Sequence, residues 1–150
     1  MKLTSPAFEH GGKIPSKYTC DGENINPPLA ISDVPPGTGS LVLIMDDPDV
    51  PKHLRADGMW DHWVVFNIPA TIREIGEGKE PEGTSGVGTS GNVEYSGPCP
   101  PDREHRYFFK LYALDTDLNL SEKATKGQVE KAMEGHVIEK TELMGRYERI

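Results

Sequence analysis

Two apolar runs separated by a polar insert constrain the fold of this chain more than any other feature. The runs are Leu41–Met45 and Trp63–Phe66, and the segments around them are rich in Pro, Asp and Gly. Short apolar runs bounded in this way are typical of buried β-strands. The insert begins with Asp47-Pro48-Asp49 and ends with Trp60 and His62. If the two strands pair as a hairpin, these polar groups lie together at one end of a sheet.

Weaker signals predict further strands. Apolar and polar residues alternate over residues 105–113, which predicts a long strand with one apolar face. Shorter strands are expected at 3–8, 30–34 and 143–147. The chain has no repeating βαβ rhythm, so a β-sandwich is favoured over a parallel α/β sheet.

One helix and one long loop complete the expected organisation. Thr125 is expected to cap a helix that contains Val129, Ala132 and Met133 and ends near Gly135. Residues 71–92 are rich in Gly and Glu and lack periodicity, which predicts a long exposed loop. We therefore expect one mainly β domain over residues 1–150, with one or two late helices.

Composition argues against several classes of protein. A net charge of −8 disfavours generic binding to nucleic acid or to an anionic membrane surface. No stretch approaches the roughly 20 apolar residues of a membrane span. The first residues also lack the apolar core of a signal peptide. We therefore expect a cytoplasmic protein without stable membrane insertion.

The two cysteines, Cys20 and Cys99, are far apart, and neither belongs to a CxxC pair. A zinc site is therefore not expected. Two reduced thiols are the ordinary interpretation for a cytosolic chain, and a disulfide is the alternative.

The ends of the predicted strands carry residues suited to anion binding. His105 opens the long strand much as His62 opens the second apolar run, and Tyr107 faces the same side as His105. Imidazole and phenol groups can donate to phosphate oxygens, and the backbone N–H groups of Ser96-Gly97 are expected to extend this cradle. Asp49 is expected to accept a hydrogen bond from a histidine and fix its tautomer. Alternatively, a carboxylate faces the cationic end of a zwitterionic ligand.

Simpler interpretations compete with this one. An Asp next to Pro is typical of a turn, and a single His at a strand start is more often structural. Asp and His also bind divalent metals, so a metal-dependent phosphoester hydrolase that uses Asp47, Asp49, His62 and His105 is an alternative. The chain contains no HExxH motif and no GxSxG elbow. We therefore expect a binding protein and not an enzyme, and we assign no catalytic residue, metal ligand or cofactor.

Several motifs resemble those of the phosphatidylethanolamine-binding protein family, which includes the Raf kinase inhibitor protein. They are Asp47-Pro-Asp-Val-Pro51, Trp60-x-His62-Trp-Val-Val-x-Asn67, and Gly97-Pro-Cys-Pro-Pro101 followed by His105-Arg-Tyr107. Further segments are similar to the bacterial and archaeal branch, namely Cys20-Asp-Gly-Glu-Asn24 with Asn26-Pro-Pro-Leu29, and Ala132-Met-Glu-Gly-His136. The resemblance extends from about Tyr18 to Tyr147.

The resemblance implies a sandwich of a large antiparallel sheet and a smaller sheet, with a C-terminal helix and a pocket for phosphate or phosphorylated headgroups. The residues that match pocket positions are Asp47, Pro48, Asp49, Trp60, His62, Gly97, Pro98, His105 and Tyr107. It also implies a cis bond before Pro51, a homodimer, and a regulatory role as an inhibitor of a kinase or protease. Because Cys20 and Cys99 lie in motifs that border the pocket, reduced thiols and a disulfide stay equally open.

The chain also departs from the family. The segment Asp102-Arg-Glu104 is short, and Asp57-Gly58 stands where larger relatives carry a longer aromatic segment. Ligand preference and kinase inhibition therefore do not transfer directly. Three functions are carried forward: a phosphoryl-binding module, an inhibitor that acts through the loop at 71–92, and the metal-dependent hydrolase.

Overall fold

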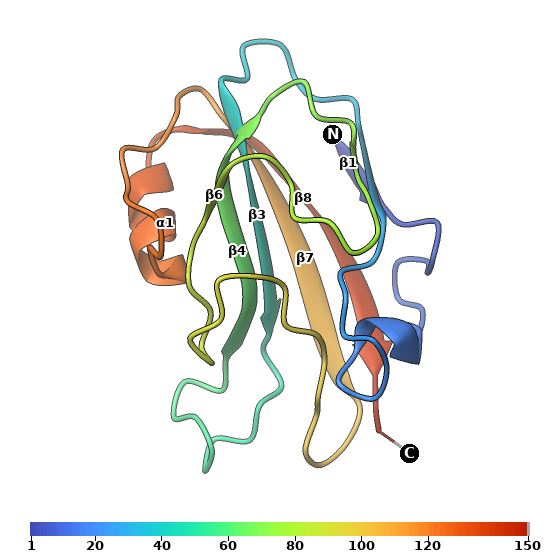
Figure 1. Ribbon diagram of the computed structural model, residues 1–150. Helices are drawn as coiled ribbons and strands as arrows, with labels where there is room; N and C mark the ends of the chain where they lie inside the picture. The colour runs from blue at the N-terminus through green and yellow to red at the C-terminus, as the bar shows by residue number, and fades with distance from the viewer. Residues whose placement is uncertain (150) are drawn as a thin grey trace.

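Two antiparallel sheets form the fold in the computed structural model, which describes residues 1–149 (Figure 1). The strands are β1 (Lys2–Thr4), β2 (Leu29–Ser32), β3 (Ser40–Asp47), β4 (Trp60–Pro69), β5 (Glu74–Ile75), β6 (Thr84–Ser85), β7 (His105–Leu114) and β8 (Val137–Tyr147), and the helices are the 3-10 helix η1 (Ser16–Tyr18) and α1 (Lys126–Met133). The larger sheet has the order β6-β4-β3-β7-β8 and the smaller one β1-β2-β5. This confirms the predicted sandwich. Within the described residues, neither helix is long and apolar enough to cross a membrane.

The central strand β3 is buried along its whole length, between β4 and β7. Its alternate residues face two separate cores. Leu41, Leu43 and Met45 pack toward the smaller sheet, whereas Val42 and Ile44 belong to the core beneath α1. Burial on both faces explains why this strand is a continuous apolar run in the sequence.

Helix α1 begins where the sequence predicts. The Thr125 hydroxyl accepts from the Gln128 N–H, and the Gln128 side chain accepts from the Thr125 N–H, which forms a capping box. Gly135, just beyond the helix, adopts a left-handed φ of 80°. Val129 and Met133 are buried against the larger sheet. The helix and the smaller sheet therefore cover opposite faces of the larger sheet (Figure 1).

A buried ion pair also lies on the helix side. Asp46 is 1 % exposed, and its carboxylate accepts from Lys110 at 2.9 Å and from Lys126 at 3.0 Å. The side chain of the next residue, Asp47, lies on the opposite face of the sheet from α1, because successive residues of a strand point to opposite faces. It contacts His105 there.

Several strand boundaries differ from the sequence predictions. The segment 71–92 is not wholly loop, because it contains β5 and β6, which pair with β2 and β4. Strands of two residues have no periodicity of their own, so the sequence gives no signal for them. The last strand, β8, begins at Val137 instead of 143, because its first half is largely exposed and shows no apolar–polar alternation. The first strand, β1, ends at Thr4 instead of continuing to residue 8.

The predicted cis bond before Pro51 is wrong. Throughout residues 1–149 no peptide bond is cis, so Val50–Pro51 is trans. The trans form of such bonds is favoured by about 0.5–1 kcal/mol. The insert turns without a cis bond, because the Pro51 carbonyl accepts from the N–H groups of Leu54 and Arg55.

Of the two states left open for the cysteines, reduced thiols and a disulfide, the structure contains the disulfide. Cys20 and Cys99 are bonded across a sequence separation of 79 residues. The bond joins the segment after η1 to the proline-rich loop before β7, so the interpretation as two reduced thiols is wrong for this state.

Candidate functional site

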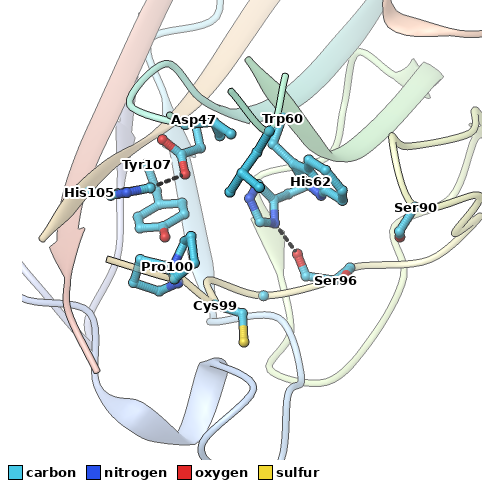
Figure 2. A pocket seen from close by; sticks show the side chains of 13 residues that line it. Asp47, Trp60, His62, Ser90, Ser96, Cys99, Pro100, His105 and Tyr107 are labelled. Carbon is cyan, nitrogen blue, oxygen red and sulfur yellow. Dashed lines mark hydrogen bonds and ion pairs between the residues drawn. The ribbon is translucent and has the colours of Figure 1, made fainter. Parts of the chain in front are cut away.

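A cavity of about 450 Å³ opens at the end of the larger sheet where β3 ends and β4 and β7 begin (Figure 2). Antiparallel pairing brings these ends together, since Asp47 lies opposite Trp60 and Asp46 opposite Phe108. The predicted hairpin is therefore confirmed. The residues that line the cavity are Asp47, Val50, Leu54, Trp60, His62, Ser90, Ser96, Gly97, Cys99, Pro100, Pro101, His105 and Tyr107.

Two walls of different origin enclose the cavity. We call one the strand wall, formed by Asp47, Trp60, His62, His105 and Tyr107 on β3, β4 and β7. We call the other the loop wall, formed by Ser96, Gly97, Cys99, Pro100 and Pro101.

Most of the predicted site residues come together here. Asp47, Trp60, His62, Gly97, His105 and Tyr107 line the cavity, whereas Pro48, Asp49 and Pro98 do not. Sequence reasoning missed Val50, Leu54, Ser90, Pro100 and Pro101, although it placed Cys99 in a motif that borders the pocket. The sequence indicates the position of the loop wall only through its proline-rich composition and its place just before the strand that begins with His105.

His105 is held between two carboxylates. Its Nδ1 lies 2.6 Å from Asp47 Oδ2, and its Nε2 lies 2.6 Å from Asp102 Oδ1. A neutral imidazole carries one N–H, so both contacts together require an imidazolium or a protonated carboxyl group. Burial raises the pKa of Asp47, although the hydrogen bond from His105 acts in the opposite direction. The hydrogen bond from His105 lowers the pKa of Asp102. Both ring nitrogens are engaged, so His105 positions the strand wall and has no free donor.

His62 has one engaged nitrogen. Its Nδ1 lies 2.7 Å from the carbonyl oxygen of Ser96, which can only accept, so Nδ1 carries the proton (Figure 2). Burial lowers the pKa of His62 below its ordinary value of 6.5. The ring is therefore neutral at pH 7, and its Nε2 is an acceptor.

Tyr107 lies between the two histidines and is fully buried. Its ring stacks on His105 with centroids 6.4 Å apart and meets His62 edge-on at 5.4 Å. Burial raises the pKa of Tyr107, so the hydroxyl stays protonated. This buried hydroxyl has no hydrogen-bond partner anywhere in residues 1–149. Since buried polar groups are nearly always paired, its O–H is available to a molecule in the cavity.

The role predicted for Asp49 is wrong. Its carboxylate accepts from Nε and Nη2 of Arg106 at 2.9 and 2.8 Å, and from the Arg106 backbone N–H at 2.9 Å. These hydrogen bonds lower the pKa of Asp49. The pleat of β7 directs Arg106 away from the cavity, and Asp49, beyond the end of β3, turns to meet it, so Asp47 is the carboxylate that holds a histidine.

The predicted backbone cradle is also wrong. The N–H of Gly97 donates to Asn24 Oδ1 at 2.8 Å, and the N–H of Ser96 donates to the His62 carbonyl at 3.3 Å. Both donors are consumed in fixing the loop wall to its neighbours.

The lining of the cavity is largely apolar. Its apolar surface comes from Val50, Leu54, Trp60 and the prolines. Neither Lys nor Arg is among the described residues that line the cavity. Ligand sites commonly combine such a surface with a few placed polar groups. An arginine stands nearby, because the Arg55 guanidinium lies 6.0 Å from the centroid of the Trp60 ring.

The residues proposed for metal binding do not form a ligand set. Asp49 turns to Arg106, which separates it from Asp47, His62 and His105. Across the described part of the chain, no three His, Cys, Asp or Glu side chains are grouped to hold one ion.

Comparison with known proteins gives a consistent result. The sequence profile of the family described as phosphatidylethanolamine-binding protein matches residues 4–148. A UPF0098 protein of Chlamydia pneumoniae is 54% identical over 149 residues, covering 99% of both chains. The crystal structure of a phosphatidylethanolamine-binding protein homologue from Chlamydia trachomatis has a TM-score of 0.96 and 49% identity, covering 99% of this chain and 97% of that one. YbcL of Escherichia coli, a member of the mammalian PEBP family, has a TM-score of 0.89 and 30% identity, with 99% and 98% covered.

Proposed function

The chain belongs to the phosphatidylethanolamine-binding protein family, and from this premise we propose that its cavity binds a phosphoryl group, carried as a phosphorylated headgroup. The observation that supports this most directly is the Tyr107 hydroxyl, which is buried without a partner among the described residues and belongs to a side chain that lines the cavity. A phosphoryl oxygen is a strong acceptor for such a donor.

His62 complements Tyr107 in a way that suits a phosphomonoester. A neutral His62 with its proton on Nδ1 presents an acceptor at Nε2. A phosphomonoester monoanion has both an acceptor oxygen for Tyr107 and a P–OH group that donates to His62. The two side chains together therefore match one protonation state of the ligand.

The rest of the cavity favours a headgroup over inorganic phosphate alone. Asp47 is the one carboxylate in the described lining. The linked Asp47, His105 and Asp102 side chains carry one net negative charge whether the shared proton lies on the imidazole or on a carboxyl group, and this charge attracts an ammonium group such as that of phosphoethanolamine. Val50, Leu54 and Trp60 offer an apolar surface for the carbon chain of the ligand. The cationic end of the ligand thus lies toward Asp47 and the phosphoryl end toward Tyr107.

Titration calorimetry with phosphoethanolamine at pH 7 tests this proposal. Tyr107→Phe should weaken binding about 10- to 150-fold, because a hydrogen bond to a charged group contributes roughly 1.5–3 kcal/mol. Tyr112→Phe is the matched control, since Tyr112 lies on the same strand but outside the cavity lining. The proposal fails if the wild type does not bind, or if Tyr107→Phe binds as tightly as the wild type.

The other roles expected from the sequence stay predictions. They are the inhibition of a kinase or protease, the homodimer and the cytoplasmic location. Inhibition that survives both His62→Ala and His105→Ala would not pass through this cavity. The hydrolase alternative gains no support from the arrangement of its four residues and is not proposed.

A further inference from the structure

The disulfide lies in the wall of the cavity and at the surface of the protein. Cys99 belongs to the loop wall, next to Pro100 (Figure 2). Both Cys20 and Cys99 are exposed. A thiol in solution can therefore reach a bond that borders the ligand site.

Few other interactions fix this part of the loop. Pro98, Pro100 and Pro101 have no N–H to donate. The Cys99 N–H makes no hydrogen bond to any residue of the described chain. The facing segment, residues 20–24, is tied to the loop by the Cys20 N–H, which donates to the Pro98 carbonyl at 3.1 Å, and by the Asn24 side chain. The covalent bond is the third link between the two segments.

The position of this loop controls groups of the strand wall. Ser96 holds His62 Nδ1 through its carbonyl, and Asp102 holds His105 Nε2. Both residues lie within three positions of Cys99. A displaced loop removes the acceptor that fixes the His62 tautomer and one of the two carboxylates that hold His105.

We propose that the Cys20–Cys99 disulfide is a redox modification site that sets the affinity of the cavity. In the oxidised protein the loop wall is preformed, and reduction loosens it and weakens phosphoryl binding. The ligand part of this inference rests on the proposed function.

The reaction is an exchange with a soluble or protein dithiol. One thiolate of the dithiol attacks a sulfur of the disulfide, forms a mixed disulfide and releases the other cysteine as a thiolate. The second thiol of the reductant then displaces the protein sulfur. Two electrons and two protons pass to the protein, which leaves Cys20 and Cys99 as thiols and the reductant as a disulfide.

Thermodynamic linkage gives a reciprocal consequence. If oxidation tightens binding by a given factor, bound ligand stabilises the disulfide by the same factor. A tenfold coupling corresponds to a reduction potential lower by about 30 mV. The midpoint of reduction by graded dithiothreitol, followed by thiol labelling, should shift by this amount in saturating phosphoethanolamine.

The deciding experiment compares phosphoethanolamine binding by the oxidised protein and by the protein in excess dithiothreitol. Reduction should weaken binding about 5- to 150-fold, the usual range for coupled sites, and reoxidation should restore it. The double variant Cys20→Ser, Cys99→Ser should bind like the reduced protein and ignore dithiothreitol, with circular dichroism to show that it folds. Equal affinity of the two redox states, or a double variant that binds like the oxidised protein, overturns the proposal.

Hydrogen exchange separates this inference from the proposed function. Reduction should increase amide exchange in residues 95–103 more than in β3, with no ligand present. Unchanged exchange in that loop overturns the claim that the disulfide holds the wall. Failure of the oxidised protein to bind phosphoethanolamine, with the exchange change present, overturns the ligand assignment instead.

Discussion

The two walls of the cavity are built by different means. The strand wall projects from three paired strands, and His105 and Tyr107 are fully buried within it. The loop wall belongs to no strand and is fixed by a few isolated backbone and side-chain hydrogen bonds and by one disulfide. The strand wall therefore shares the stability of the core, whereas the loop wall depends on a few local links that can be altered one at a time.

The largest effect on stability is expected from the core that supports the strand wall. Leu43 on β3 is 0 % exposed, so Leu43→Ala should lower the free energy of unfolding by about 2–5 kcal/mol in urea titrations. Leu54→Ala is the matched control, because Leu54 is 53 % exposed and should change stability by less than about 0.5 kcal/mol. Similar losses for the two variants would contradict the idea that the strand wall carries the stability.

A smaller effect is expected in the loop wall. A Cβ at Gly97 would lie 2.2 Å from the Tyr18 carbonyl oxygen and 2.6 Å from Asn24 Oδ1. Gly97→Ala should therefore cost about 1–3 kcal/mol in the same titrations and also weaken phosphoethanolamine binding.

Gly127→Ala provides the comparison for Gly97→Ala. The nearest atom to a Cβ at Gly127 is Thr125 Oγ1, at 4.0 Å, and the residue is helical. This variant should be neutral or gain about 0.4–1 kcal/mol. If Gly97→Ala proves as stable as Gly127→Ala, the loop wall can shift to make room for a Cβ without lowering the free energy of unfolding.

The smallest effect concerns the ion pair outside the strand wall. Asp49 is 14 % exposed and Arg106 is 52 % exposed, so solvent limits their contribution to about 0.2–1 kcal/mol. The Arg106 hydrogen bonds hold the pKa of Asp49 below its ordinary value of 3.8. This stability is therefore fully present above pH 3.8 and is lost as the pH falls through the lower pKa of the folded protein.

Urea midpoints of wild type and Asp49→Asn should therefore differ at pH 7 and converge in acid. Asp57→Asn, at an Asp that is 59 % exposed and 3.6 Å from Arg55, should match the wild type at both pH values. A difference between Asp49→Asn and wild type that persists in acid would show that the Asp49 side chain acts through packing and not through its charge.

Much of the fold could be predicted because its signals are local. The apolar runs of β3 and β4, the alternation of β7 and the cap at Thr125 each reflect physical preferences of a few neighbouring residues. The short strands β5 and β6 exist only through pairing with distant strands, and β8 starts with an exposed stretch that does not alternate, so their sequences carry little signal.

The same distinction holds in the cavity. Strand ends and side-chain alternation in the sequence are enough to predict that His62, His105 and Tyr107 lie together. The pairing of Asp49 with Arg106 and the use of the Gly97 N–H by Asn24 depend on which way each chain turns after its strand ends. No short-range pattern encodes those choices, so the predicted donors differ from the observed ones.

The neutral His62 has a consequence for ion selectivity in the proposed function. With its proton on Nδ1, the ring can pair only with an anion that brings a proton of its own. Inorganic phosphate carries such a proton at neutral pH, and a phosphomonoester carries one below its second pKa of about 6, whereas sulfate is fully ionised. The cavity is then expected to reject sulfate, a tetrahedral anion of similar size, because sulfate has no proton to donate to His62.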